Sequence, residues 1–164
     1  MSQFSVIARL LQLLSILGAA FVLLQPTLLF SATLMEAETL SLGPVLFRTP
    51  ADTTWLKALL TLIPNAIVAW GLIHLSLFGN HLALGSRFTA AVSGSLRKAS
   101  FLFVLGVLLS WLIEPLKTEQ PLFQTFLQLL ENHGLLLLIS IAFALVSILL
   151  KEAREIEAEN QEFY

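Results

Sequence analysis

The residues best placed to do chemistry in this chain include two amides, Gln25 and Asn65. Each stands beside a proline, Pro26 and Pro64 respectively, inside a long apolar run. Because proline has no backbone N–H, it leaves the carbonyl one turn earlier in a helix without its usual donor. Amides at such kinks can hold an ion or a polar substrate, as in the broken helices of transporters. The simpler interpretation is that the two amides satisfy each other and the kinks across a helix interface.

Histidines offer a second kind of site. His74 and His81 are seven residues apart, which places them on one face of a helix, two turns from each other. A haem held between helices needs an axial ligand facing it from each side, but these two imidazoles come from one helix. His133 is expected at the opposite side of the membrane. The simpler interpretation of His74 is a hydrogen-bonded core residue, and we expect no metal and no cofactor.

Covalent catalysis finds little support in the sequence. The chain contains no cysteine, which excludes disulfides and thiolate chemistry. It also lacks the HExxH zinc motif, the GxSxG nucleophile motif and a phosphate-binding glycine loop. We therefore expect a protein that is not an enzyme. No basic face is large enough to neutralise several phosphates of a duplex, so we expect no direct binding of nucleic acid.

The composition indicates that these residues are positioned by membrane helices. Of the 164 residues, 57% are hydrophobic and only 12% are charged, and the mean hydropathy is +0.85. A soluble domain carries about 25% charged residues. This chain has too little charge to cover a surface that faces water. The composition therefore predicts an integral membrane protein of one domain.

Charged residues divide the chain into four apolar spans. We predict an all-α, four-helix transmembrane bundle over residues 1–164, with helices at about 8–34, 56–79, 98–116 and 133–160. About 17–20 residues suffice to cross a hydrocarbon core of about 30 Å. The uncharged run from Leu10 to Met35 is longer than the roughly 7–15 residues of a signal peptide's apolar core. We therefore expect this run to be retained as the first span.

Lysines and arginines predict the orientation, because loops rich in them stay in the cytoplasm. Six of the nine lie in the N-terminal segment, the middle loop and the tail: Arg9, Arg87, Arg97, Lys98, Lys151 and Arg154. Arg48, Lys57 and Lys117 lie in the other two loops. We therefore predict a bacterial inner-membrane protein, in contact with the lipid bilayer, with both termini and the middle loop in the cytoplasm.

The segments outside the spans are also expected to carry structure. Residues 36–54 are too apolar for a loose linker and predict either a short hairpin or a segment lying on the membrane surface. Apolar residues recur at helical spacing before the fourth span, which predicts an interfacial amphipathic helix in the third loop: Leu122, Phe123, Phe126, Leu129 and Leu130. No helix breaker follows Gly134, so the fourth helix is expected to extend into the cytoplasm. Within that helix, Ser140, Ala144 and Ser147 are typical of close helix packing.

The middle loop and the tail each carry a short motif. The loop motif consists of Gly85, Phe88 and Thr89, followed by Leu96 and Arg97. The tail motif consists of Glu152, Ile156, Glu159, Asn160 and Phe163. Both resemble segments of a family of small bacterial four-helix membrane proteins of unknown function, often encoded beside a small helix-turn-helix regulator. The resemblance implies a fold and a location, and it implies no chemistry.

Both motifs fall on the predicted cytoplasmic side. Gly85 can supply a positive-φ turn, and Thr89 can cap a short helix over residues 90–98. Phe88 would dip into the interface, while Arg87 and Arg97 would pair with acids of the tail: Glu152, Glu155 and Glu159. The alternative is a solvated tail and a loop that contacts anionic lipid.

Three functional hypotheses follow from these patterns. The main one is a non-enzymatic protein whose middle loop and C-terminal helix bind a cytoplasmic partner, such as a small transcriptional regulator. Its candidate contact residues are Arg87, Phe88, Thr89, Arg97, Glu152, Glu155, Glu159 and Asn160. The second is a small transporter or channel subunit with a polar site at Gln25 and Asn65. The third is a haem or quinone redox protein around His74.

Overall fold

The computed structural model describes residues 3–36, 39–42, 45–48, 54–85, 89–117 and 122–162. Most of them belong to four long helices: α1 (Gln3–Leu34), α2 (Trp55–Ala83), α3 (Ala90–Lys117) and α4 (Leu122–Glu162). Two short strands, β1 (Thr39–Leu42) and β2 (Val45–Arg48), stand between α1 and α2 in the chain.

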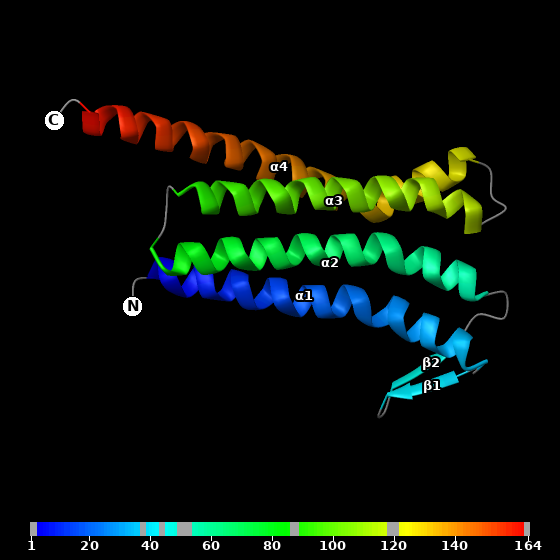
Figure 1. The fold of residues 1–164 in the computed structure, drawn as a ribbon. Coiled ribbons are helices and arrows are strands. Elements are labelled where there is room, and N and C mark those ends of the chain that lie inside the picture. Colours follow the sequence, from blue (N-terminus) through cyan, green and yellow to red (C-terminus); the bar gives the residue numbers. More distant parts are fainter. Residues whose placement is uncertain are drawn as a thin grey trace.

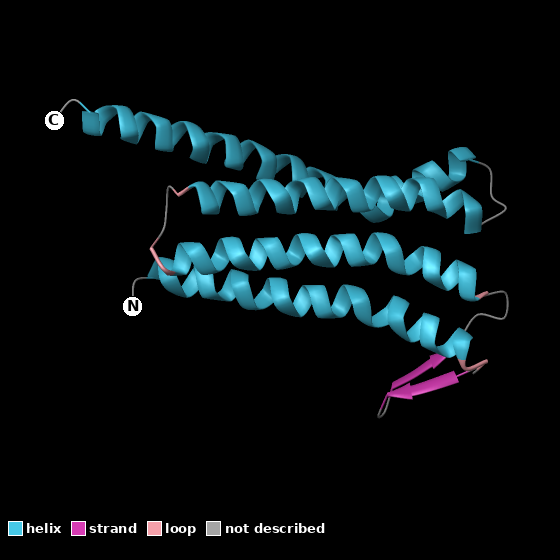
Figure 2. Ribbon diagram, in the orientation of Figure 1, coloured by secondary structure: helices cyan, strands magenta, loops and turns pink. Residues whose placement is uncertain are grey.

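The helices pack in chain order, each running antiparallel to the one before it (Figure 1). The start of α1 and the end of α4 lie at one end of the molecule, which we call the basic end because it carries Arg9, Arg97, Lys98, Lys151 and Arg154. The two strands lie at the opposite end, which we call the hairpin end (Figure 2). Close packing joins α1 to α2, α2 to α3, and α3 to α4.

The segment between α1 and α2 forms an antiparallel hairpin. Thr39 pairs with Arg48, and Leu42 pairs with Val45. β1 lies beside the end of α1 (Figure 1). Of the two conformations that the sequence allowed for this segment, the structure has the hairpin.

Both α3 and α4 begin earlier than the sequence predicted. The short helix expected at residues 90–98 forms the first turns of α3, and the interfacial helix expected in the third loop forms the first turns of α4. A single glycine inside a helix costs only about 1 kcal/mol relative to alanine, so Gly134 does not end α4. Trp111 of α3 meets Phe126 of α4 edge to face, with ring centroids 5.1 Å apart. This contact packs the first turns of α4 against α3.

The turn after α2 has the geometry that the sequence predicted. Gly85 has a φ of +85°, which confirms the expected positive-φ turn. Its N–H donates to the carbonyl of Leu82, and the N–H of Leu84 donates to that of Asn80, each at 3.1 Å. Glycine tolerates this conformation because it has no Cβ.

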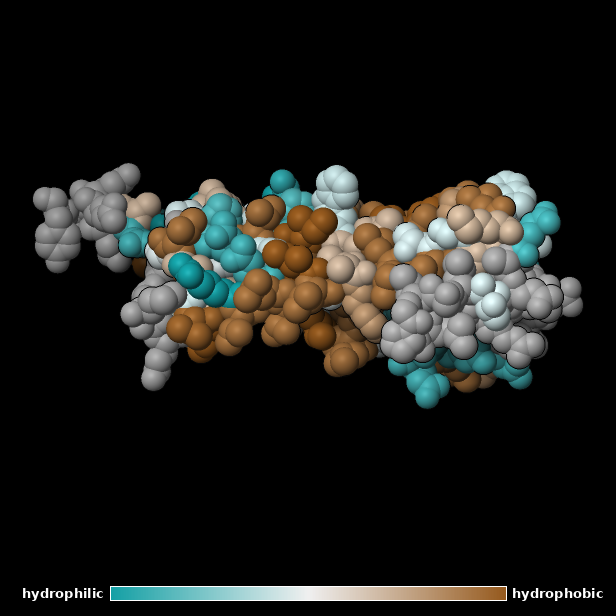
Figure 3. All heavy atoms as spheres, turned by 90° about the horizontal axis from the view of Figure 1, so that it is seen from below, coloured by the Kyte–Doolittle hydropathy of each residue, from teal (hydrophilic) through white to brown (hydrophobic). Residues whose placement is uncertain are grey.

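The four helices are long and apolar enough to cross a membrane. Their apolar spans are 28 to 30 residues long, which at about 1.5 Å per residue exceeds a hydrocarbon core of about 30 Å. Large apolar side chains remain exposed on them, including Phe21 at 77% and Leu112 at 70%. Figure 3 shows hydrophobic residues dominating the middle of one face, with hydrophilic residues toward both ends. These features are those of a multi-pass membrane protein, confirming the predicted class.

Small residues let α2 and α3 approach closely in the middle of the molecule. A Cβ added to Gly71 would lie 2.6 Å from Cε1 of Phe103, and one added to Gly106 would lie 2.6 Å from Cγ2 of Val68. Toward the basic end, the packed core consists of Leu75, Leu96, Ala99 and Phe103, with side chains from all four helices around it.

A buried hydrogen bond joins α3 to α4. The hydroxyl of Ser100 donates to the carbonyl of Ser140 at 2.7 Å, and the hydroxyl of Ser140 donates to Leu136 on its own helix at 2.6 Å. Ser140 and Ser147 are both buried. The small residues of α4 therefore lie where helices pack, which agrees with their predicted role.

Replacing Gly79 by alanine tests the packing of α2 on α1. The new Cβ would lie 2.9 Å from the carbonyl oxygen of Ala8 and 3.0 Å from the backbone nitrogen of Gln12, and backbone cannot rotate away. We expect G79A to lower the free energy of unfolding in detergent by about 1–3 kcal/mol. The matched control is G94A, because a Cβ there meets nothing within 4 Å and should stabilise its helix. Equal effects of the two substitutions would contradict this packing.

Candidate functional site

A cavity of about 320 Å³ lies at the hairpin end, where side chains of all four helices meet. Its polar lining residues lie toward the helix ends: Thr61, Asn65, Ser110, Glu114, Lys117 and His133. Its apolar lining residues lie toward the middle of the membrane-spanning region and include Val22, Val68, Val107 and Leu136. The lining of the cavity is therefore mixed, and both of its charged residues, Glu114 and Lys117, stand in the last turn of α3.

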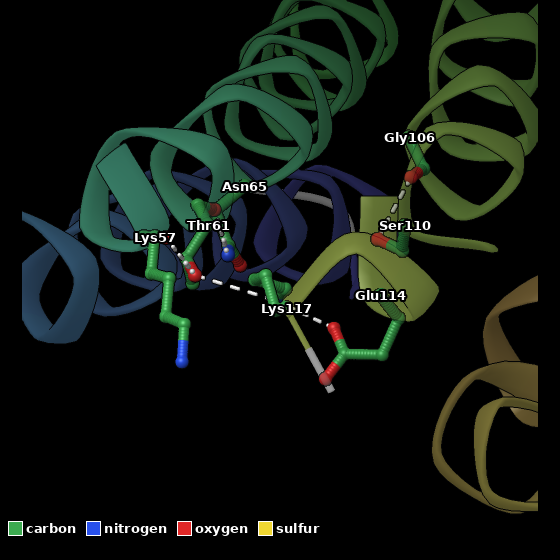
Figure 4. A network of polar contacts seen from close by, with 7 residues as sticks. All are labelled: Lys57, Thr61, Asn65, Gly106, Ser110, Glu114 and Lys117. Carbon is green, nitrogen blue, oxygen red and sulfur yellow. Dashed lines mark hydrogen bonds and ion pairs between the residues drawn. The ribbon is translucent and has the colours of Figure 1, made fainter. Parts of the chain in front are cut away.

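Lys117 is the centre of the polar network (Figure 4). Its ammonium nitrogen lies 2.6 Å from Oε2 of Glu114, one turn earlier on α3. The same nitrogen donates to the hydroxyl oxygen of Thr61 on α2, at 3.3 Å. The Lys117 side chain is only 16% exposed and that of Glu114 is 34% exposed. This partial burial strengthens the ion pair, because less water screens the two charges.

Two further groups on α2 and α3 complete the network that Figure 4 shows. The side-chain amide of Asn65 donates to the carbonyl of Thr61 at 2.8 Å. The hydroxyl of Ser110 donates to the carbonyl of Gly106 at 3.0 Å. Each of these side chains donates one hydrogen bond to its own helix. The side-chain oxygen of each can still accept a hydrogen bond. The cavity can therefore offer both donors and acceptors to a bound molecule.

The local sequence explains why these groups share one cavity. Ser110, Glu114 and Lys117 are spaced by 4 and 3 residues, so they line one face of α3. Thr61 and Asn65 are likewise four residues apart on α2. The tight contact of Gly106 with Val68 brings the two faces together just below these residues.

The cavity includes one of the two predicted amides. Asn65 lines it, whereas Gln25 is exposed on α1 and does not. Both neighbouring prolines, Pro26 and Pro64, are buried inside their helices. Of the two amides, the structure thus brings only Asn65 to the cavity, and its hydrogen-bond partner is the carbonyl of Thr61 and not Gln25.

Sequence reasoning missed most of the polar lining. The charge pattern predicts Lys117 only as a loop residue, and it does not single out Glu114 as a site residue. The signal that could have found them is the 4-and-3 spacing of Ser110, Glu114 and Lys117, which places polar groups on one helical face. Which helix that face meets could not be read from spacing alone.

His74 lies in a different place, on the side of α2 nearer the basic end. Its Nε2 accepts a hydrogen bond from the indole N–H of Trp70 at 3.1 Å. It lines a separate hollow with Arg97 and Lys98, whereas His133 lines the cavity at the hairpin end. Within the described ranges, no three metal-binding side chains gather at one point. The haem or quinone hypothesis stays a prediction.

The proposed contact of loop and tail lies only partly within the described residues. Arg87 and Phe88 fall outside them, and Thr89 is exposed just before α3. Arg97 shares a hollow with Lys151 and Arg154 of α4, while Lys151 pairs with Glu155 at 3.5 Å. The other tail acids, Glu152 and Glu159, are exposed, and Asn160 belongs to the last turns of α4. The loop–tail contact therefore stays a prediction.

Comparisons add no assignment to this geometry. No family model, curated protein or solved structure matches the chain. The resemblance of the middle loop and tail to a family of small bacterial membrane proteins stays a prediction as well.

Labelling of single cysteines tests whether the cavity holds water, since the natural chain has no cysteine to interfere. We expect S110C to react with a small membrane-impermeant methanethiosulfonate, because Ser110 lines the cavity. S100C is the matched control on the same helix, since Ser100 is 5% exposed and bonded to α4. L108C, which is exposed on the apolar surface, should also stay unlabelled because lipid does not ionise a thiol. Labelling of S110C no faster than of S100C would contradict a wet cavity.

Proposed function

We propose that this chain is a non-enzymatic bacterial inner-membrane protein that binds a small polar solute in its cavity, as a transporter subunit does. In this proposal the four helices form a bundle with both termini in the cytoplasm and the cavity at the outer face. The support for this orientation is the excess of lysine and arginine at the basic end.

The observation that carries the proposal is the Lys117 ammonium inside a cavity, in contact with both Glu114 and Thr61. Lys117 is the last residue of α3, at the membrane boundary, yet its side chain is only 16% exposed. Holding a charge away from water is costly, and a charged group kept in a cavity in this way can mark a binding site. One cation and one anion here leave the lining close to neutral. Such a pair suits a zwitterionic solute. The carboxylate of the solute can bind the ammonium of Lys117, and the ammonium of the solute can bind the carboxylate of Glu114.

The volume of the cavity and the packing beneath it both bear on which solutes it can bind and how they could cross. A volume of about 320 Å³ is at the lower end of ligand pockets, which favours a small solute. Below the cavity, the close contact of α2 with α3 and the core around Phe103 fill the interior. A site closed below favours binding with alternating access over a continuous open pore.

Titration with small charged probes tests this proposal. We expect at least one of the zwitterions glycine, β-alanine and alanine to raise the thermal stability of the full chain in detergent. At one hundred times the dissociation constant, the gain is about 2.7 kcal/mol. Acetate and methylammonium, which carry one charge each, should give much less.

Two lysine variants serve as a matched pair in the same titration. K117M should abolish the response, whereas K151M should keep it, because Lys151 makes an exposed ion pair away from the cavity. The proposal fails if no zwitterion stabilises the protein, or if K117M responds like the natural chain.

A second proposed function is the binding of a cytoplasmic protein, such as a small transcriptional regulator, by the end of α4. The observation that favours it is that α4 continues beyond its apolar span, with Glu152, Glu155 and Ile156 exposed. Figure 1 shows these last turns projecting past the start of α3. Such an exposed helix with acids around one apolar residue can dock on a basic groove.

Removal of this extension tests the second function. We expect a chain truncated after Lys151 to lose a protein that the full chain retains in a quantitative pull-down. The triple variant E152Q/E155Q/E159Q, which keeps the helix, should lose the same protein because docking depends on these charges. An identical set of retained proteins for all three forms would count against this function.

A further inference from the structure

The hollow that Arg97 shares with Lys151 and Arg154 lies at the basic end, between α3 and α4, and has a volume of about 230 Å³. Three cations line it: Arg97 from α3, and Lys151 and Arg154 from α4. The rest of its lining is small and includes Ser93, Gly94 and Ser147. The hollow is thus a pocket with positively charged walls and room between them.

The charges around this hollow do not cancel. Lys151 lies 3.5 Å from Glu155, with both side chains more than half exposed, so this pair is weak. Arg97 and Arg154 make no ion pair with an acid in the described part of the chain. The start of α3, at Ala90, also borders the hollow and adds the positive end of a helix dipole. The residues that line the hollow thus carry three positive charges and no negative one, while Glu152, Glu155 and Glu157 stand on the same turns of α4 outside the lining.

The level of the hollow matches that of lipid headgroups. Arg97 and Lys117 are twenty residues apart on α3, which corresponds to about 30 Å along the helix. That length equals the thickness of a typical hydrocarbon core. On α4, Lys151 is the first charged residue after the uncharged run 134–150. The three cations therefore lie where phosphates of the leaflet at the basic end would lie.

A second groove adjoins the charged hollow at Arg97. This groove, of about 430 Å³ between α2 and α3, is lined by Trp70, Phe101 and Leu102 as well as by His74, Arg97 and Lys98. A phosphate held by Arg97 would thus have aromatic and aliphatic side chains next to it that suit an acyl chain. A free phosphate ion has no acyl chain to place against these side chains.

We propose that the hollow between α3 and α4 binds the phosphate of an anionic phospholipid headgroup. Arg97 and Arg154 form charge-assisted hydrogen bonds to its oxygens, and Lys151 adds a third positive charge. A phosphate monoester, with a charge of about −1.5 to −2 near neutral pH, is attracted by the three cations of the lining more strongly than a singly charged diester is. The preferred ligand is therefore a lipid of the phosphatidate type.

Binding of short-chain lipids to the purified full chain in detergent tests this proposal. The probes are dioctanoyl phosphatidate, the corresponding phosphatidylglycerol and phosphatidylcholine, and inorganic phosphate. We expect affinity to fall in that order, with inorganic phosphate failing to displace phosphatidate at equal concentration. Equal competition by inorganic phosphate would overturn the assignment to a lipid, and equal binding of phosphatidylcholine would overturn the assignment to an anion.

Variants locate the binding within the hollow. R97Q and R154Q should each weaken phosphatidate binding by about tenfold, the loss of one charge-assisted hydrogen bond. R9Q is the matched control, because Arg9 is exposed at the same end but outside the hollow. G94L keeps all three cations but fills the hollow with a leucine side chain, which fits without a clash because a Cβ at this position meets no atom within 4 Å. It should weaken binding as well.

Two results would overturn the location. One is a loss of affinity in R9Q as large as that in R154Q, which indicates only general attraction of charge. The other is unchanged binding in G94L, since a filled hollow cannot hold a headgroup. Circular dichroism of each variant confirms that its helices are intact before binding is compared.

Discussion

The close approach of α2 and α3 at Gly71 and Gly106 is the constraint on which the rest of the structure depends. Phe103 contacts Gly71 and Val68 contacts Gly106 so closely that neither glycine has room for a Cβ atom. Because lipid supplies no hydrophobic drive between helices, packing of this kind decides how membrane helices associate. On the basic-end side of this contact lies the apolar core around Phe103, and on the hairpin-end side lies the cavity with Lys117.

Charged residues are placed differently on the two sides of this contact. On the hairpin-end side, Lys117 reaches from α3 to Thr61 on α2 and holds Glu114, so a cavity persists between the helices. On the basic-end side, Leu96 and Phe103 fill the core, and the cations Arg97 and Arg154 line a hollow outside it. The proposed solute site and the proposed headgroup site therefore lie at opposite ends of the molecule, with this packing contact between them.

Much of the fold could be predicted from the sequence, because a helix that can cross a membrane is a long run of apolar residues with few charges. The four spans, the turn at Gly85 and the packing positions Ser140 and Ser147 all follow from local patterns. The starts of α3 and α4 could not be predicted from polarity, because each helix begins in a more polar segment and continues without a break into its apolar span. The cavity was missed because the partner of the Glu114–Lys117 face depends on how α3 is rotated against α2. That rotation is set by Gly106 and Val68, which lie 38 residues apart in the chain.

The central claim is that one packing contact separates a wet cavity from a dry core. An experimental structure of the full chain in a lipid nanodisc, at a resolution that shows ordered water, tests it most directly. We predict solvent density between Ser110 and Lys117, an ion pair between Glu114 and Lys117, and no solvent between Phe103 and Leu75. Apolar side chains filling the space around Ser110, or a water path running on past Phe103, would contradict the claim.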